Sequence, residues 1–487
     1  MSFIAMLRRI LSVLLPIISV SAQARQLPVP AALIPQQQFD VNAAMVSPLR
    51  DEPGNGADTA MRTPRTLRLG AAELSRYPGL LFKVLLQALS ANQEEVVLKL
   101  LPYYRQQPDA DARLIQWGEA MMARRQRRYD ESIRMYRDTL AREPQNLPVR
   151  MQLATTLFLN HEDEAALDQF ERIRAMNLPA SATHAVNRYI EAVHQRDQWD
   201  ISGGLSYIRD DNVNNAPRPD TTLYGFRAWE PESASGAQYR IQLGRRLPLR
   251  NQYYNRVDIE TGGKQYFSNR QYSESNATVS WSLGGQTGNR DIRLGPMYEK
   301  KWYAGGRATS DSLKQYSAFT GLALQASYWF NSHWQWRTQL QWGRERFNRQ
   351  SYLDGTTLLW SNTAFYLSSA ARFWNAGVDY YRKGARDKAH AFHLWNARAG
   401  WGQDWPLGIS TYLQISYSQR KYEGYRLFLA QRQKNKETVA QLSVWHRGLH
   451  FLGFTPRLTF SYQSVRSNHA FYQFDKSRVF VDVSRRF

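Results

Sequence analysis

The chain has 487 residues, no cysteine and a formal charge of +21 at pH 7, from 63 Lys and Arg against 42 Asp and Glu. A sequence without cysteine excludes a disulfide framework, a thiolate zinc site, a cysteine nucleophile and a lipidated cysteine anchor. The mean hydropathy of -0.57 excludes a bundle of transmembrane helices, yet aromatic residues make up 13% of the chain. This combination is typical of an outer-membrane β-barrel, whose strands alternate lipid-facing and lumen-facing residues.

Residues 1–24 have the order of a secretory signal peptide. Arg8 and Arg9 precede an apolar run over 10–20, and the small residues Ala22 and Ala24 flank Gln23 around a cleavage site. The following segment, 25–77, is rich in Pro, Gln, Ala, Asn and Gly without a countable period. We therefore expect an exported chain whose mature form begins with a Pro-rich periplasmic arm, mobile or loosely docked.

Residues 78–197 have helical spacing and an internal repeat. Ser132 and Ala166 occupy equivalent places 34 residues apart, as do Tyr136 and Phe170. This is the period of tetratricopeptide repeats, each of which is a helix pair. We expect two good repeats, an earlier degenerate pair over 80–106 and a capping helix around 182–194. Three prolines mark a similar period as helix stops: Pro108, Pro144 and Pro179.

Tetratricopeptide domains bind partners in a groove lined by the first helix of each repeat. The predicted groove residues are Ile115, Glu119, Met122, Met151, Thr155 and Phe158. The alternative is that the apolar members of this set are packing between repeats, because apolar residues at helical spacing usually are. The segment has 16 basic and 16 acidic residues between positions 80 and 197, so its surface is neutral overall.

From 198 to 487 the period changes to two, which places alternate residues on opposite faces of a strand. In residues 334–342 one face carries Trp, Trp, Thr, Leu and Trp, and the other Gln, Arg, Gln and Gln. We expect a 14-stranded antiparallel transmembrane β-barrel, so the fold class is α + β multidomain. The segments begin near Trp199, Ala237, Tyr253, Tyr272, Asn289, Leu313, His333, Gly355, Arg372, Ala389, Gly408, Lys434, Phe454 and Phe474.

The lengths of the connections indicate which end of the barrel faces the periplasm. If the helical domain is periplasmic, the even connections, such as 287–288 and 331–332, lie inside and are short. The odd connections, such as 209–236, lie outside and are long, which is the usual asymmetry. The chain ends on Phe487 after alternating apolar residues, which is similar to the insertion signal of the barrel assembly machinery; an ordinary edge strand is the alternative.

The excess of positive charge falls on the barrel segment, scattered without a compact Lys/Arg run. Cations at the rims would pair with phosphates of lipopolysaccharide, and those in the lumen would attract acidic cargo. Export and a barrel argue against nucleic-acid binding. We find no Gly-x-Ser-x-Gly, His-Glu-x-x-His, calcium-loop or phosphate-loop pattern, and therefore predict no enzyme activity, catalytic residue, cofactor or metal.

One polar segment stands at the end of the first predicted strand, and its simplest interpretation is a structured turn. Asp and Asn side chains cap turns by hydrogen-bonding nearby backbone groups. A bare calcium site is the alternative, although a spaced third carboxylate is missing. The residues are Asp210, Asp211, Asn212, Val213, Asn214 and Asn215, followed by Ala216 and Pro217.

With this segment, the order of signal peptide, short tetratricopeptide domain and 14-stranded barrel resembles the Slam family, the surface lipoprotein assembly modulators of Gram-negative bacteria. The resemblance covers the mature chain apart from the arm. It implies an outer-membrane translocon of type XI secretion, which moves surface lipoproteins, or soluble haem-binding proteins, from the periplasm to the cell surface. Independently of the resemblance, we expect an N-terminal domain in the periplasm whose groove receives cargo or a periplasmic chaperone, and insertion of the barrel by the barrel assembly machinery. The role of the polar segment in the family is not implied.

Two other functions fit the same architecture. A polysaccharide exporter also joins tetratricopeptide repeats to a barrel, usually with many more repeats. A porin or an outer-membrane hydrolase with a scaffold domain is the third possibility. In each case we expect a monomer embedded in outer-membrane lipid and lipopolysaccharide.

Overall fold

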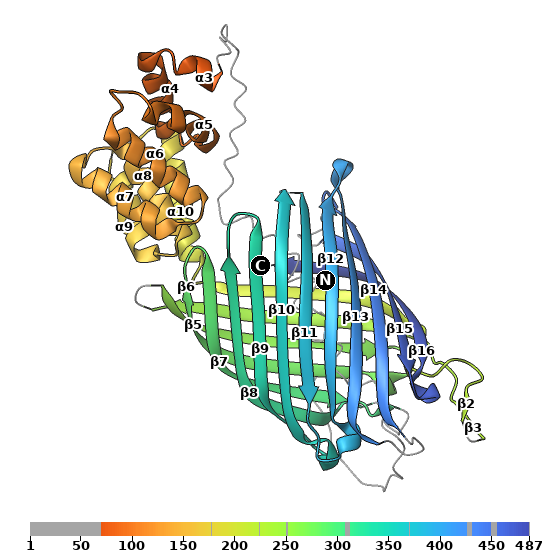
Figure 1. Cartoon of the computed structure of the whole chain (residues 1–487). Helices are drawn as coiled ribbons and strands as arrows, with labels where there is room; N and C mark the ends of the chain where they lie inside the picture. The colour runs from red at the N-terminus through yellow and green to blue at the C-terminus, as the bar shows by residue number, and fades with distance from the viewer. Residues whose placement is uncertain are drawn as a thin grey trace, which may run out of the picture.

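The computed structural model describes residues 70–486, except 177, 224, 250–251, 307–311, 370, 426–430 and 450–454. A helical module is followed by a β-barrel, and the module lies against one end of it (Figure 1). The predicted signal peptide, the predicted arm over 25–69 and the terminal Phe487 lie outside the described residues.

The helical module is a series of antiparallel helix pairs closed by a single helix. The short α3 falls in the range predicted as arm, because four residues are too few to show a helical period. None of the helices in the described residues is long and apolar enough to cross a membrane. The helices are α3 (Ala71–Leu74), α4 (Pro78–Ser90), α5 (Glu94–Arg105), α6 (Ala112–Arg125), α7 (Tyr129–Arg142), α8 (Leu147–Leu159), α9 (Asp163–Arg174) and α10 (Ala180–Gln195).

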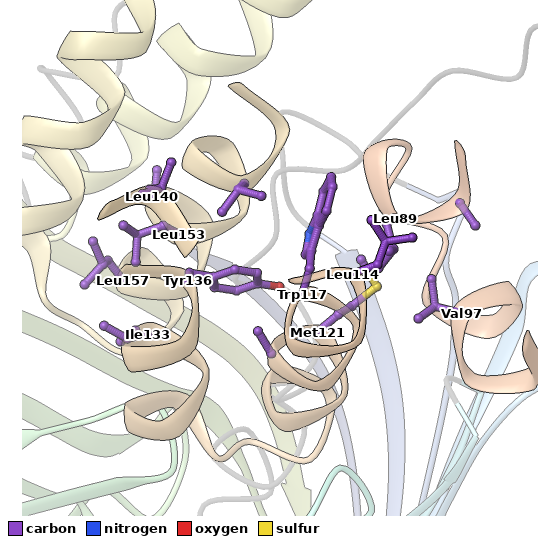
Figure 2. Packing of buried hydrophobic residues seen from close by; sticks show 14 of the residues in the cluster. Leu89, Val97, Leu114, Trp117, Met121, Ile133, Tyr136, Leu140, Leu153 and Leu157 are labelled. Carbon is purple, nitrogen blue, oxygen red and sulfur yellow. The ribbon is translucent and has the colours of Figure 1, made fainter. Parts of the chain in front are cut away.

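The repeat period places equivalent residues in equivalent parts of one continuous core. Tyr136 of α7 and Phe170 of α9 are both fully buried. Figure 2 shows Tyr136 between leucines of α7 and α8 on one side and Trp117 of α6 on the other. Gly118 is required for a close approach, because a Cβ there would lie 2.8 Å from the Leu101 side chain. Stacking of this kind stabilises repeats that cannot bury their apolar faces alone.

The barrel is closed and antiparallel, with 14 strands. The predicted starting points agree well with the structure, and the largest differences are Ala237 against Ala234 and Ala389 against Phe392. The strands are β1 (Trp199–Asp210), β4 (Ala234–Pro248), β5 (Tyr253–Tyr266), β6 (Glu274–Gln286), β7 (Arg290–Tyr303), β8 (Lys314–Trp329), β9 (Trp334–Phe347), β10 (Gly355–Ser369), β11 (Arg372–Lys383), β12 (Phe392–Asp404), β13 (Ile409–Tyr425), β14 (Arg432–His446), β15 (Thr455–Ser467) and β16 (Phe474–Arg486).

The two faces of the barrel wall differ in polarity. Exposed apolar side chains surround the outside, including Leu205, Trp281, Trp342 and Ile415, each about half exposed. Inside, Asp379 is buried and receives hydrogen bonds from polar side chains of neighbouring strands, with Arg398 Nη2 at 3.0 Å. An apolar outer belt around a polar interior is the arrangement of a transmembrane β-barrel.

The strand connections define two ends of the barrel, which we call the module end and the far end. At the module end the connections are short, as in 287–289 and 330–333. At the far end, 211–233 is the longest connection and contains the hairpin of β2 (Thr222–Leu223) and β3 (Phe226–Arg227). Figure 1 shows this hairpin at the opposite end from the helices.

Candidate functional site at the far end of the β1–β16 seam

The barrel closes where its first strand meets its last, and we call this pairing the seam. The register runs from Ser202↔Arg486 to Asp210↔Arg478. On its other side, β1 pairs with β4 from Trp199 onward. Among the described residues, the β1–β16 register therefore begins at Ser202, three residues after the start of β1.

The polar segment predicted as a turn begins where the seam ends. The backbone N–H of Asn212 donates to Asp210 Oδ1 at 3.1 Å. The Asn212 side chain then binds the backbone of Ala216 twice, donating to its carbonyl at 2.9 Å and accepting from its N–H at 2.7 Å. Asn215 has φ 47°, in the left-handed region that asparagine tolerates. The prediction of a structured turn is therefore confirmed.

The same segment is bonded to β16 as well as to itself. Lys476 Nζ lies 2.8 Å from Asp210 Oδ2, and both side chains are buried. Lys476 also donates to Asn215 Oδ1 at 3.2 Å. The backbone N–H of Ser477 donates to Asp211 Oδ1 at 3.0 Å. The turn thus ties the far end of β1 to the start of β16.

A second set of contacts holds the turn against the barrel mouth. The N–H of Val213 donates to the carbonyl of Glu232 at 2.8 Å, and Asn214 accepts from the N–H of Glu232 at 3.1 Å. Val213 is buried in a cluster with Ile208 of β1 and Tyr266 of β5. All six residues of the motif therefore belong to one compact structure, residues 210–216, which we call the latch.

Further along the same connection, Arg218 adds another contact to β16. Its side chain binds Asp475 Oδ2 through Nη2 at 3.0 Å and Nε at 3.2 Å. Arg218, Asp475 and Lys476 were not singled out from the sequence. A lone lysine or arginine in a basic barrel gives no signal of its partner, which lies more than 250 residues away.

The latch borders a cavity of about 310 Å³ inside the barrel at the far end. Its lining includes Asp210, Asn215 and Lys476 of the latch contacts, several tyrosines and the charged pair of Lys301 and Glu345. Lys301 Nζ lies 3.3 Å from Glu345 Oε1. The cavity therefore presents both charges and aromatic rings to whatever enters the barrel from this end.

The predicted groove residues of the helical module divide into two groups. Ile115, Glu119, Met122, Met151 and Thr155 are half-buried, and Glu119 forms an ion pair with Arg105. Phe158 is buried at 2% exposure and packs edge-on against Tyr189, with the Arg196 guanidinium over its ring. Placing Phe158 in an open groove was wrong, because its ring fills the space between α8 and α10.

The helical module docks on the module end of the barrel through backbone and side-chain contacts. The N–H of Gly288 donates to Asn160 Oδ1 at 3.1 Å, and Gln252 donates to the Asn160 carbonyl at 2.9 Å. The Arg127 guanidinium lies over the Trp329 ring at 4.2 Å. These contacts join the α6–α7 and α8–α9 turns to short connections of the barrel.

Beside this docking site, His161 is half-buried in the turn after Asn160, and its Nδ1 atom is enclosed. Burial lowers the pKa of His161 well below its usual 6.5, and the nearby charges of Arg196 and Arg246 lower it further. An imidazolium there would be desolvated next to two cations, so the neutral form is favoured. His161 is therefore a neutral group at neutral pH, at the junction of the two parts.

The carboxylates of the latch are used in hydrogen bonds and an ion pair rather than grouped for a cation. Asp210 faces Lys476, and Asp211 accepts from Ser477. Within the described ranges, no group of three or more His, Asp or Glu is placed to hold a metal ion. The arrangement is that of a structural closure between two strands.

Comparisons with known proteins agree with this architecture over its whole extent. The model of the surface lipoprotein assembly modifier family matches residues 199–487, and the model of that family's N-terminal tetratricopeptide repeats matches 67–170. The chain belongs to the surface lipoprotein assembly modifier family. The resemblance seen in the sequence is thus confirmed. The family and the transmembrane barrel place the chain in the outer membrane with its helical module in the periplasm, so the far end is extracellular.

Several curated relatives are similar over most of their length. Surface lipoprotein assembly modifier 1 of Haemophilus influenzae is 39% identical over 424 residues, which is 87% of this chain and 88% of that protein. Surface lipoprotein assembly modifier 1 of Neisseria meningitidis serogroup B is 32% identical, over 97% of this chain and 96% of the relative. The hemophilin secretion modulator of Acinetobacter baumannii is 23% identical, over 84% and 86%.

Among solved structures, a Pseudomonas aeruginosa FadL homologue matches with a TM-score of 0.36 and 9% identity, over 65% of this chain and 93% of that one.

Proposed function

We propose that this protein moves specific lipoproteins, or a soluble haem-binding protein, from the periplasm to the cell surface. The observation that carries the proposal is the family match over both parts of the chain. The names of the relatives supply the cargo classes, surface lipoproteins for most and hemophilin for one. A closed β-barrel also satisfies its own backbone hydrogen bonds in the membrane and can enclose a polar interior, so it offers a polar chain a way across.

In this proposal the helical module receives the cargo, or a periplasmic chaperone that carries it. Its five half-buried groove residues offer apolar side chains beside a charged pair, Glu119 and Arg105. Half-buried methionines such as Met122 and Met151 suit a site that accepts different peptides, because the thioether side chain adapts its shape. The docking of the module on the barrel turns would deliver the cargo at the periplasmic entrance.

The latch would control the exit. An opening between β1 and β16 is the simplest lateral route. These are the first and last strands of the barrel, so no hairpin connects them and only their pairing holds them together. The latch holds the extracellular end of this seam through Lys476 and Ser477, and Arg218 adds a contact to Asp475. Release of these contacts by arriving cargo would widen the seam, and their return would reseal the membrane.

Insertion by the barrel assembly machinery, function as a monomer and the absence of an enzymatic step complete the proposal. The residue ranges are a signal peptide over 1–24, an arm over 25–77, the module over 78–197 and the barrel over 198–487. Energy would come from cargo folding outside the cell or from binding, because the sequence contains no nucleotide motif.

Protease shaving of intact cells tests the proposal. Cells with and without this protein are treated with an external protease, and the released peptides are identified by mass spectrometry. We expect one or two lipoproteins to disappear from the surface while remaining inside the cell, or a soluble haem-binding protein to disappear from the medium. An unchanged surface and medium, with loss of a secreted glycan, would contradict protein export and favour a polysaccharide exporter.

A substitution pair separates the receptor role from folding. Met122→Glu with Met151→Glu places charges in the half-buried groove, and we expect lower cargo display with a stable module. Phe158→Ala is the contrasting variant, because it empties a buried site and destabilises the module itself by roughly 3–5 kcal/mol. Normal display by the methionine variant would contradict a receptor role for the groove.

A further inference from the structure

Positive side chains form a row on the outer face of the barrel at its extracellular end. Arg382 of β11 pairs in register with His393 of β12, and His393 pairs with Lys421 of β13. Lys421 in turn pairs with Lys434 of β14. All four positions alternate with lumen-facing residues, so their side chains share the face that carries the apolar belt. Strands lie about 4.8 Å apart, which brings the cations of Arg382, Lys421 and Lys434, with the His393 ring among them, within about 15 Å.

The row continues one step toward the membrane with Lys436, which pairs with Arg466 of β15. Lys421, Lys434 and Lys436 are exposed, and no carboxylate is paired with them in the part of the chain that the structure describes. The Glu423 carboxylate lies at the other end of the row, 3.0 Å from His393 Nε2 and 3.9 Å from the Arg382 side chain. Like charges opposite one another on a sheet are unfavourable, so an anion placed here would be stabilised.

Aromatic side chains lie directly beneath the cations. Tyr380 and Trp395 pair in register with ring centroids 4.7 Å apart, and Trp395 is 51% exposed. Tyr380 Oη and His393 Nδ1 are 2.7 Å apart, which fixes both rings. Aromatic rings of this kind mark the level of the lipid headgroups, with hydrocarbon below them. Further toward the membrane centre the same face carries Val378 and Ile415, both about half exposed.

A hollow of about 350 Å³ joins the cationic and aromatic rows. It is lined by Tyr380, His393, Trp395, Gln419 and Lys421. The hollow opens on the outside of the barrel, so it is separate from the lumen cavity and from the latch. Its upper edge is positive and able to donate hydrogen bonds, and its lower edge is aromatic.

We propose that this hollow binds the phosphorylated headgroup of a lipopolysaccharide molecule in the outer leaflet. The phosphates would lie against Lys421, Lys434 and Lys436, and an acyl chain would follow Trp395 toward Val378. The extracellular end faces the leaflet in which lipopolysaccharide is the phosphate-bearing lipid. The site goes beyond the proposed function and does not depend on it.

Binding to purified, delipidated full-length protein tests the site. The test variant is Lys421→Gln/Lys434→Gln/Lys436→Gln, and the single Lys421→Glu is a second, smaller change. The control is Lys300→Gln/Arg344→Gln/Arg346→Gln, which removes the same number of cations from the same rim on β7 and β9. Correct folding of each variant is checked by its heat-modifiable migration in gels. Affinity is measured by quenching of tryptophan fluorescence and by native mass spectrometry.

We expect wild type and the control variant to bind diphosphorylated lipopolysaccharide and the test variant to bind it roughly a hundredfold more weakly, since each lysine at an anionic lipid surface contributes about a factor of five. Lys421→Glu should weaken the binding of diphosphorylated lipopolysaccharide by at least a factor of about five. Dephosphorylated lipopolysaccharide and inorganic phosphate should bind much more weakly to wild type. Equal weakening in the control variant, equal binding of dephosphorylated lipopolysaccharide, or equal binding of phosphatidylglycerol would each overturn the proposal.

Discussion

Lys476 of β16 and Asp210 of β1 form a buried ion pair, 2.8 Å between Nζ and Oδ2, at the extracellular end of the strand pairing that closes the barrel. Both residues also contact other parts of the latch, Lys476 through Asn215 and Asp210 through Asn212. The first and last strands are therefore held by side-chain contacts in addition to the backbone ladder. This is the position at which a lateral exit would have to open and close.

Breaking the pair should weaken the seam strongly. Asp210→Asn leaves the buried Lys476 ammonium without its counter-charge, which costs about 3–5 kcal/mol in a buried site. The double variant with Lys476→Met should lose less, because no unpaired charge remains. The free energy of unfolding in lipid vesicles measures both. Arg227→Gln is the control, since Arg227 pairs with Asp220 and Glu230 in exposed positions. If Arg227→Gln lowered the free energy of unfolding as much as Asp210→Asn does, the account would be contradicted.

Loss of the latch turn should make the outer membrane permeable. Asn212→Ala removes two buried hydrogen bonds to Ala216, a loss of about 2 kcal/mol. We expect a larger seam opening and greater sensitivity of cells to a large antibiotic such as vancomycin. Asn348→Ala, an exposed position in another far-end connection, is the control. Equal sensitivity of both variants would show that the latch does not seal the barrel.

The docking of the module depends on a glycine in a barrel turn. A Cβ on Gly288 would lie 2.4 Å from the Tyr129 ring and 2.5 Å from the Leu159 carbonyl oxygen. Gly288→Ala should therefore push the module away from the barrel and lower cargo display. At Gly285 the nearest atoms to a Cβ are 3.4 Å away, so Gly285→Ala is the matched control. Limited proteolysis between α10 and β1 reports the loosening, and equal protection in both variants would rule it out.

Acid should destabilise the same junction. The pKa of His161 is lowered in the folded protein by burial, so the unfolded or undocked state binds the proton more readily. The contribution of neutral His161 is fully present above its ordinary pKa of about 6.5 and decreases as the pH falls below that value. Hydrogen exchange of the α8–α9 turn at pH 7.5 and 5.5 measures this. His161→Gln should show a smaller pH effect, and an unchanged pH effect would assign it to another group.

Much of the fold follows from residue periodicity. The alternation in residues 334–342 correctly predicted β9. The 34-residue repeat that relates Ser132 to Ala166 and Tyr136 to Phe170 identified four positions that are all buried. Periodicity succeeds there because a lipid-facing or core-facing side chain must recur with the period of its own strand or helix. It failed for α3 and for the β2–β3 hairpin, which are too short to show a period.

The site was predictable only in part. The turn from Asp210 to Ala216 was indicated by side chains that bond to nearby backbone, a local interaction that composition reveals. Its attachment to β16 was not, because Asp211 and Ser477 are 266 residues apart and nothing near either residue indicates the other. Phe158 was misplaced for a related reason: helical spacing shows that a residue faces a neighbouring helix, but does not show whether α10 covers it.

A reversible disulfide across the seam tests the proposed exit most directly. The chain has no cysteine, so Tyr207→Cys/Val481→Cys, a register pair of β1 and β16, introduces the sole thiols. Ile259→Cys/Val279→Cys joins β5 to β6 as the control. Surface display of the cargo is measured in oxidised cells and again after reduction. We predict that the oxidised seam pair abolishes display, that reduction restores it, and that the control pair has no effect. Normal display with the seam fully cross-linked would contradict the account.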